Sequence, residues 1–226
     1  MNPDTTCWTL IRGAAGGDGE DRNSFARLYL PVVRSCLEAR WRASPLAGEV
    51  EDAVQVVFLE CCRDGGALEK VWPGKPGSFR SFLYTVVKNV AHRFEVGRAR
   101  SRARRAGSRF ELSAVEAEEE GLASAFDRAW LLSLLDQALA LQEDRAREKG
   151  DDAVRRMELL RLRHVEDVPI RDIARRFNEP ADRMHYEYRK ARMDFVKALE
   201  EVLAFQYPDD PEARKREFDR LKAHVK

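Results

Sequence analysis

Residues 169–192, PIRDIARRFNEPADRMHYEYRKAR, carry the clearest structural signal in the chain. The apolar side chains of the first part recur at i, i+3, i+4 and i+7, the spacing of one helix face; they are Ile170, Ile173, Ala174 and Phe177. The tripeptide 178–180, Asn-Glu-Pro, then favours a short turn. A second apolar stripe follows, formed by Met184, Tyr188, Ala191, Phe195 and Leu199. The pattern predicts a helix-turn-helix with helices over 169–177 and 181–204.

Polar and basic side chains of the second helix are expected on the side opposite its apolar stripe. They include Asp182, Arg183, Tyr186, Arg189 and Lys190. A DNA major groove accepts such a helix, and Arg or Lys then reaches base acceptors or phosphates. Glu187 lies beside this face, where a carboxylate is unfavourable near phosphates. An ordinary solvated helix face fits the same pattern equally well.

The first half of the chain is predicted to be helical, and two of its helices carry the motifs discussed below. A helix over about 48–63 follows from apolar residues spaced by three and four, namely Val50, Ala53, Val54, Val57, Phe58 and Cys61. A second helix is expected from Ser78 onward, with a stripe of Phe79, Phe82, Leu83, Val86, Val87, Val90 and Phe94. Residues 64–78 are rich in Gly and Pro and predict a loop. Because no segment alternates with period two for long, we expect an all-α protein.

Residues 101–121 contain few apolar side chains and two blocks of opposite charge, which is typical of an exposed linker. An arginine cluster within 93–109 is followed at once by five glutamates within 111–120. Beyond it we expect a helix over 122–149 and another that ends near His164. We therefore expect two helical domains, 1–105 and 125–204, joined by a flexible linker over 106–124. Residues 205–226 form a C-terminal extension that either packs on the second domain or regulates access to DNA; a loose surface tail is the alternative.

Composition excludes several classes of protein. The chain has 226 residues, 44% of them hydrophobic, and its formal net charge is +1. It lacks a long apolar run and a basic, apolar N-terminus, so we expect no membrane insertion, no signal peptide and a cytoplasmic location. Its four cysteines show neither metal-ligand nor disulfide spacing, so we expect buried thiols, with redox sensing by Cys61 and Cys62 as the alternative. No nucleotide loop, metal cluster or catalytic triad is recognisable, so we expect no cofactor, no metal and no enzymatic activity.

Two motifs occur in an informative order. The first is 51–59, EDAVQVVFL, and the second is 79–84, FRSFLY, with Val87 and Asn89. Together with 172–174, DIA, and 189–192, RKAR, they resemble the extracytoplasmic-function (group 4) class of bacterial RNA polymerase sigma factors. Segment 126–130, FDRAW, resembles the start of the second conserved domain in a subset of that family. The chain departs from the family pattern at Val56, at Phe82 and in 181–184, ADRM.

The resemblance implies a non-catalytic subunit that directs core RNA polymerase to promoters and opens them. It assigns domain 1–105 to region two and domain 125–204 to region four. Asp52, Gln55 and Leu59 are then expected to contact the clamp helices of the polymerase's largest subunit. The family also makes an anti-sigma factor or another regulatory partner conceivable, and it implies promoter DNA, double-stranded and single-stranded, as the second partner.

Two sets of residues are expected to bind promoter DNA. Opening the downstream element requires cations for single-strand phosphates and aromatic rings for unstacked bases. The expected residues are Trp72, Lys75, Arg80, Tyr84, Lys88, Asn89, His92 and Arg93. For the upstream element they are Arg171, Arg183, His185, Tyr186, Arg189 and Lys190. The main alternative function is a freestanding helix-turn-helix regulator whose first domain dimerises or senses a signal.

Overall fold

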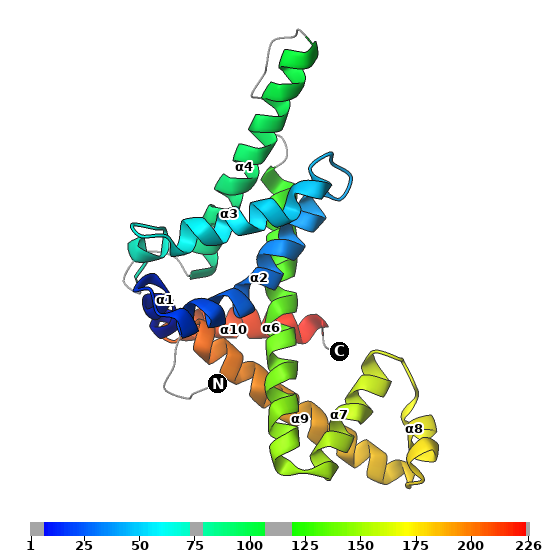
Figure 1. Ribbon diagram of the computed structural model, residues 1–226. Helices are drawn as coiled ribbons and strands as arrows, with labels where there is room; N and C mark the ends of the chain where they lie inside the picture. The colour runs from blue at the N-terminus through cyan, green and yellow to red at the C-terminus, as the bar shows by residue number, and fades with distance from the viewer. Residues whose placement is uncertain (1–6, 73–78, 107–118, 225–226) are drawn as a thin grey trace. The chain divides into compact units, whose positions relative to one another are not determined.

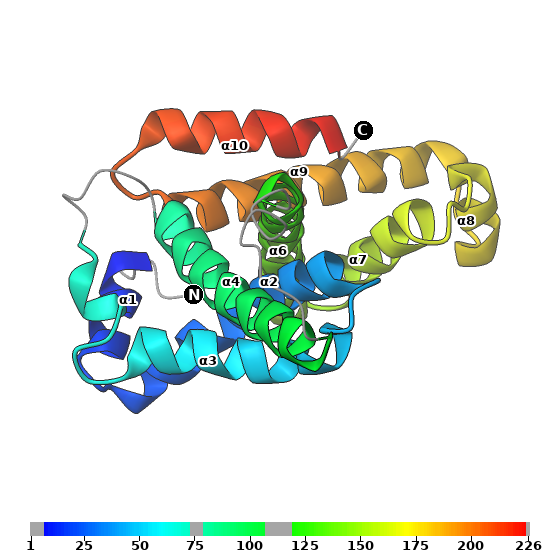
Figure 2. The same ribbon diagram turned by 90° about the horizontal axis from the view of Figure 1, so that it is seen from above.

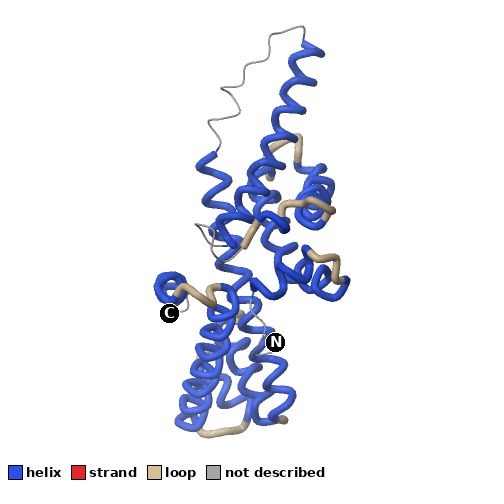
Figure 3. Tube along the Cα trace, turned by 90° about the vertical axis from the view of Figure 1, so that its left-hand side faces the viewer, coloured by secondary structure: helices blue, strands red, loops and turns tan. Residues whose placement is uncertain are grey.

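The computed structural model describes residues 7–72, 79–106 and 119–224, and in this part of the chain every regular element is helical (Figure 3). The predicted all-α fold class is confirmed. The chain divides into two compact units, which we describe separately. The N-terminal unit comprises residues 2–133 with 206–209, and the C-terminal unit comprises 134–205 with 210–226.

Among its described residues, the N-terminal unit contains four helices and the beginning of α6 (Figure 1). They are α1 (Cys7–Ala15), α2 (Gly19–Trp41), α3 (Val50–Cys62), α4 (Phe79–Ala106) and the first part of α6 (Glu119–Lys149). Two 3-10 turns, η1 (Ala47–Glu49) and η2 (Leu68–Lys70), lie between them. The predicted helices over 48–63 and from Ser78 onward thus correspond to α3 and α4.

Local capping and carbonyl contacts fix the ends of the first helices. The Asp18 side chain accepts a hydrogen bond from the N–H of Asp21 at 2.8 Å, which satisfies one of the open donors at the start of α2. Arg22 in the first turn of α2 donates to the Ala14 carbonyl and to the Cys62 carbonyl, each at 3.0 Å. One guanidinium therefore holds the ends of α1 and α3 beside the start of α2.

An aromatic cluster occupies the core of the N-terminal unit. Tyr29 of α2 packs against Phe25 and Phe79, with ring centroids 5.0 and 4.9 Å away. The Trp130 ring of α6 stacks on Tyr29 at 6.0 Å. All four side chains are buried. Because large aromatic rings contribute most to core stability, α6 completes this core rather than lying beside it.

This packing differs from the expected division of the chain. Residues 119–124, expected to be linker, form the first turns of α6, and 125–133, expected in the second domain, group with the N-terminal unit. Residues 107–118 of the expected linker lie outside the described residues. Apolar side chains at Leu122, Phe126 and Trp130 explain the difference, because they bury one face of α6 in the N-terminal unit.

The C-terminal unit contains the rest of α6 with α7 (Asp151–His164), α8 (Ile170–Phe177), α9 (Ala181–Gln206) and α10 (Pro211–His224). Figure 2 shows α7 beside the first half of α9, with α8 close to both. Gly150, with a φ of 90°, separates α6 from α7, and such a value is strained for residues that carry a Cβ. Gln142 of α6 donates to the Ala191 carbonyl of α9 at 2.9 Å inside the unit.

The expected C-terminal extension contains a regular helix. Asp210 caps α10, because its side chain accepts from the N–H of Ala213 at 2.8 Å, and Pro211 occupies the first helical position. Residues 210–226 group with the C-terminal unit. The helix spans 14 residues.

Candidate nucleic-acid interface

The helix-turn-helix is built around one apolar cluster shared by α7, α8 and α9. Its buried members are Leu159, Leu162, Ile170, Ile173, Ala174 and Met184, against which Val168, Phe177 and Tyr188 pack. Asn178 ends α8 in the left-handed conformation, with a φ of 52°, which asparagine tolerates better than most residues. Residues 178–180 therefore suffice to turn the chain from α8 into α9. The predicted inward faces of both helices are confirmed.

The side chains expected at the upstream promoter element are all exposed. Arg171 lies on α8, and α9 carries Arg183, His185, Tyr186, Arg189 and Lys190. Since the apolar stripe of α9 faces the cluster, these residues share the solvent side of the helix-turn-helix. Their contact with DNA remains a prediction.

The start of α8 keeps a net positive charge. Asp172 Oδ1 lies 2.6 Å from Arg175 Nη2 and 3.6 Å from Arg171 Nε. Two guanidinium groups thus share one carboxylate, so one positive charge is left uncompensated within this trio. This balance is favourable for a phosphate beside Arg171.

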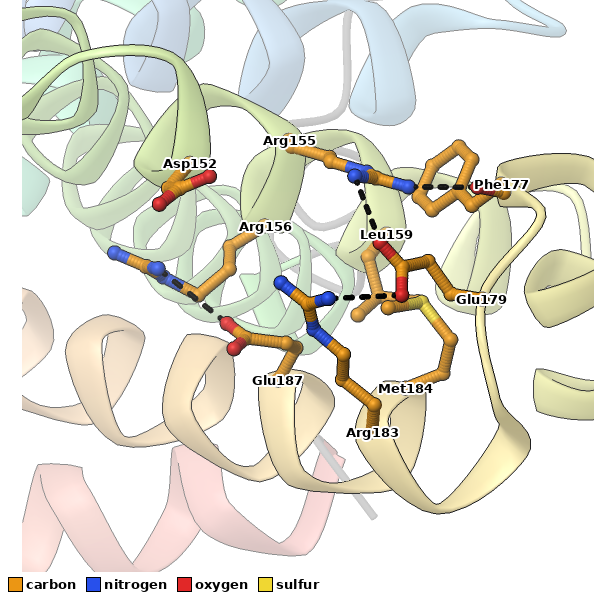
Figure 4. A pocket seen from close by; sticks show the side chains of 9 residues that line it. All are labelled: Asp152, Arg155, Arg156, Leu159, Phe177, Glu179, Arg183, Met184 and Glu187. Atoms are coloured by element: carbon orange, nitrogen blue, oxygen red, sulfur yellow. Dashed lines mark hydrogen bonds and ion pairs between the residues drawn. The ribbon is translucent and has the colours of Figure 1, made fainter.

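Glu187 is paired with a guanidinium of a neighbouring helix, which it shares with Asp194. Its Oε2 lies 3.4 Å from Arg156 Nη1 of α7 (Figure 4). Arg156 Nε is also 3.8 Å from Asp194 Oδ2. The Glu187 side chain is mostly buried. Its expected repulsion of phosphates is therefore weakened by a guanidinium that the sequence pattern did not reveal.

The residues expected to contact polymerase lie together on α3. Asp52, Gln55 and Leu59 are exposed, at positions i, i+3 and i+7, which share a face of a helix. Leu59 is 65% exposed, whereas Ala53, Val54 and Val57 are buried on the other side. An apolar side chain between polar groups on a surface suits a protein interface better than a purely solvated face.

The residues expected at the downstream element lie in α4 and in the segment before it. Trp72 is 55% exposed, and Asn89 and His92 are also exposed. Lys88 is half-buried, and Arg93 forms an ion pair with Glu60 of α3. Lys75 lies outside the described residues.

Arg80 and Tyr84 of this set contact α6. Arg80 forms an ion pair with Asp127, and its own side chain is only 18% exposed. The Tyr84 ring meets the Phe126 ring edge-on, with centroids 5.3 Å apart. The sequence placed 126–130 in the other domain, so it gave no sign of these two contacts. The apolar spacing of Phe126 and Trp130 was visible, but a stripe does not identify what it packs against.

The last turns of α4 carry a further basic surface. Figure 1 shows this part of the helix projecting beyond α3. Its exposed arginines are Arg98, Arg100, Arg102, Arg104 and Arg105. Like charges at i, i+4 destabilise an isolated helix, and a polyanion such as DNA relieves that repulsion.

Burial governs the cysteine chemistry. Desolvation raises the pKa of the Cys7, Cys36 and Cys61 thiols to about 12. It also raises the pKa of half-buried Cys62. Thiolate is the reactive species, so these environments suit packing rather than redox sensing.

Within residues 7–72, 79–106 and 119–224, no helix is both long and apolar enough to cross a membrane. The same residues contain no group of three or more His, Cys, Asp or Glu side chains placed to hold a metal ion.

No family model matches the chain, and neither a curated protein nor a solved structure does so.

Proposed function

We propose that the chain is a bacterial sigma factor of the extracytoplasmic-function class, which binds core RNA polymerase, directs it to specific promoters and promotes strand opening. The exposed Asp52, Gln55 and Leu59 face of α3 carries this proposal, because it joins an unburied leucine to the motif that resembles the family. In a freestanding regulator such a face would instead serve dimerisation, so binding to core polymerase separates the two functions.

The neighbouring surface of α4 suits the strand-opening step. Trp72 offers an exposed aromatic ring on which an unpaired base can stack, at about 1–3 kcal/mol per base, whereas the Tyr84 ring is half-buried against Phe126. Asn89 and His92 offer hydrogen bonds from exposed positions on α4. The basic last turns of α4 add a surface for the phosphate backbone.

The helix-turn-helix of the C-terminal unit supports recognition of a duplex element. Its core orients α9 so that Arg183, Arg189 and Lys190 are exposed on one surface. Side chains of this kind read guanine edges or neutralise phosphates in a major groove. We assign this surface to the upstream promoter element.

Run-off transcription with core RNA polymerase tests the proposal most directly. We expect initiation from specific promoters only when the full chain is added. Leu59→Glu should abolish polymerase binding in a pull-down and should leave the unfolding midpoint nearly unchanged, because the side chain is largely exposed. Glu38→Gln, an exposed carboxylate on α2, serves as the control and should retain binding.

Operator binding by a dimer without polymerase, combined with no promoter-dependent transcription, would favour the freestanding regulator and overturn the sigma assignment. Failure to bind core polymerase at low ionic strength would have the same consequence, since interface electrostatics are strongest there.

A further inference from the structure

The turn between α8 and α9 carries a carboxylate held by two helices. Glu179 Oε2 accepts a hydrogen bond from Arg183 Nη1 of α9 at 2.9 Å. Glu179 Oε1 lies 3.4 Å from Arg155 Nη1 of α7. Figure 4 shows the carboxylate between the two guanidinium groups. The Glu179 side chain is only 16% exposed, so the two cations supply much of the stabilisation that water would otherwise give.

Arg155 makes further contacts with the same turn. Its Nη2 donates to the Phe177 carbonyl at 2.9 Å, and its guanidinium carbon lies 4.7 Å from the centroid of the Phe177 ring. The carbonyl belongs to the last residue of α8, where helical carbonyls lack intrahelical partners. Arg155 therefore ties α7 to the end of α8 and to the carboxylate that precedes α9.

Arg183 is more exposed to solvent than Arg155. Its side chain is 58% exposed and lies in the first turn of α9. An arginine here exchanges a carboxylate for a phosphate or a base edge only if the carboxylate it leaves remains compensated. Removing the single partner of a mostly buried charge is costly, whereas removing one of two partners is much less so.

We propose that Arg155 is a positioning residue for DNA recognition, acting through Glu179 on Arg183. In the free protein, Glu179 orients the Arg183 side chain. When Arg183 moves to the DNA, Arg155 keeps the Glu179 carboxylate compensated. The inference rests on the proposed function, because it requires that α9 binds DNA. It adds a residue on α7, outside the helix-turn-helix, that determines how readily Arg183 reaches its target.

A double-mutant cycle on the full chain tests this mechanism. The probes are a duplex enriched by the wild-type chain from a random pool and a scrambled duplex of equal length. Arg155→Met removes the charge and keeps most of the stem, and Glu179→Gln removes the carboxylate charge. We expect Arg155→Met to weaken binding of the enriched duplex roughly tenfold or more. The double variant should recover most of that loss, because no charge then remains to be compensated.

Arg161→Met provides the matched control, because Arg161 also lies on α7 and pairs with Glu158 at 2.8 Å on an exposed surface. It should bind both duplexes like the wild type. Circular dichroism and the unfolding midpoint of each variant separate a loss of fold from a loss of positioning. Should Arg155→Met unfold the chain, the comparison of Arg155→Gln with Arg155→Gln/Glu179→Gln replaces it, because glutamine removes the charge and keeps a hydrogen-bond donor.

A purely structural role for Arg155 predicts no recovery by Glu179→Gln, since the Phe177 carbonyl would still lack its donor. That result, or unchanged DNA binding by a folded Arg155→Met variant, overturns this inference and leaves the proposed DNA recognition standing. A wild-type chain that enriches no duplex overturns the proposed DNA recognition first, and this inference with it.

Discussion

Arg80 of α4 forms an ion pair with Asp127 of α6 inside the N-terminal unit. Beside it, the Tyr84 ring contacts Phe126 edge-on. Under the proposed function, a carboxylate thus stands where a phosphate is expected and an aromatic ring where a base is expected. Part of the surface assigned to the single strand is therefore engaged by the chain itself.

Asp127→Asn should strengthen binding of single-stranded DNA. The substitution removes the carboxylate that competes for Arg80, and each phosphate contact contributes to a salt-dependent affinity. We expect an increase of about threefold to tenfold in anisotropy titrations at low salt, equivalent to roughly 0.7–1.4 kcal/mol. Asp136→Asn, an exposed change of equal charge on α6, should give less than half of this gain. Equal gains for the two variants would show a general charge effect and contradict the role of Asp127.

Neutralising the last turns of α4 should reduce the salt dependence of duplex binding. In Arg98→Gln/Arg102→Gln/Arg105→Gln, three exposed cations at i, i+4 and i+7 are lost. The slope of log affinity against log salt should become shallower by about 2–3, near 0.9 for each lost phosphate contact. The same number of charges removed from α10, at Lys215, Arg216 and Lys222, serves as the control. An unchanged slope in the α4 variant would mean that these arginines do not meet phosphates.

Tyr29→Phe should destabilise the N-terminal unit, although the aromatic ring at this position in the core is retained. The Tyr29 hydroxyl donates to Gln206 Oε1 at 3.0 Å, and both side chains are buried. Loss of the donor leaves a buried amide oxygen without this bond, at a cost of about 1–3 kcal/mol in the free energy of unfolding. Urea denaturation measures the change, with exposed Tyr186→Phe as the control. Equal midpoints for Tyr29→Phe and the wild type would contradict the contact.

The stability of the C-terminal unit should fall as pH drops through the range in which His164 titrates. Burial, and then the charges of Arg163 and Arg192, lower the His164 pKa below its ordinary value, and Tyr188 Oη lies 2.9 Å from Nε2. Because the unfolded chain binds the proton at a higher pH than the folded chain, acidification from about pH 7 favours unfolding. The pH dependence of the unfolding midpoint between about pH 7.5 and 5.5 should be smaller in His164→Gln than in the wild type. A larger pH dependence in His164→Gln than in the wild type would show that folding does not lower the pKa of His164.

Helical periodicity was sufficient to predict most of the elements. Most residues of the predicted stripes of α3, α4, α8 and α9 are buried, because an apolar face must be covered whatever covers it. No helix was predicted at the start of α10, although Asp210 followed by Pro211 is typical of a capped helix with proline at its first position. The charged residues that follow made this helix less conspicuous than the others.

Pairwise contacts between elements were beyond the sequence. Nothing in the spacing of Phe126 and Trp130 indicated that they pack on Tyr84 and Tyr29. The compensation of Glu187 by Arg156 was equally hidden, because the two residues are 31 positions apart. Ion pairs of this kind depend on how helices approach each other, which a single sequence does not encode in any short pattern.

The packing of Trp130 on Tyr29 determines where an expressed N-terminal fragment should end. A fragment that stopped at residue 118 would remove the Trp130 ring from Tyr29 and the Phe126 ring from Tyr84, and it would present apolar surface to water. Extending the fragment to residue 133 retains both rings. Expressing the first half alone therefore calls for a stop codon within α6, after the aromatic residues, rather than in the acidic segment that precedes them.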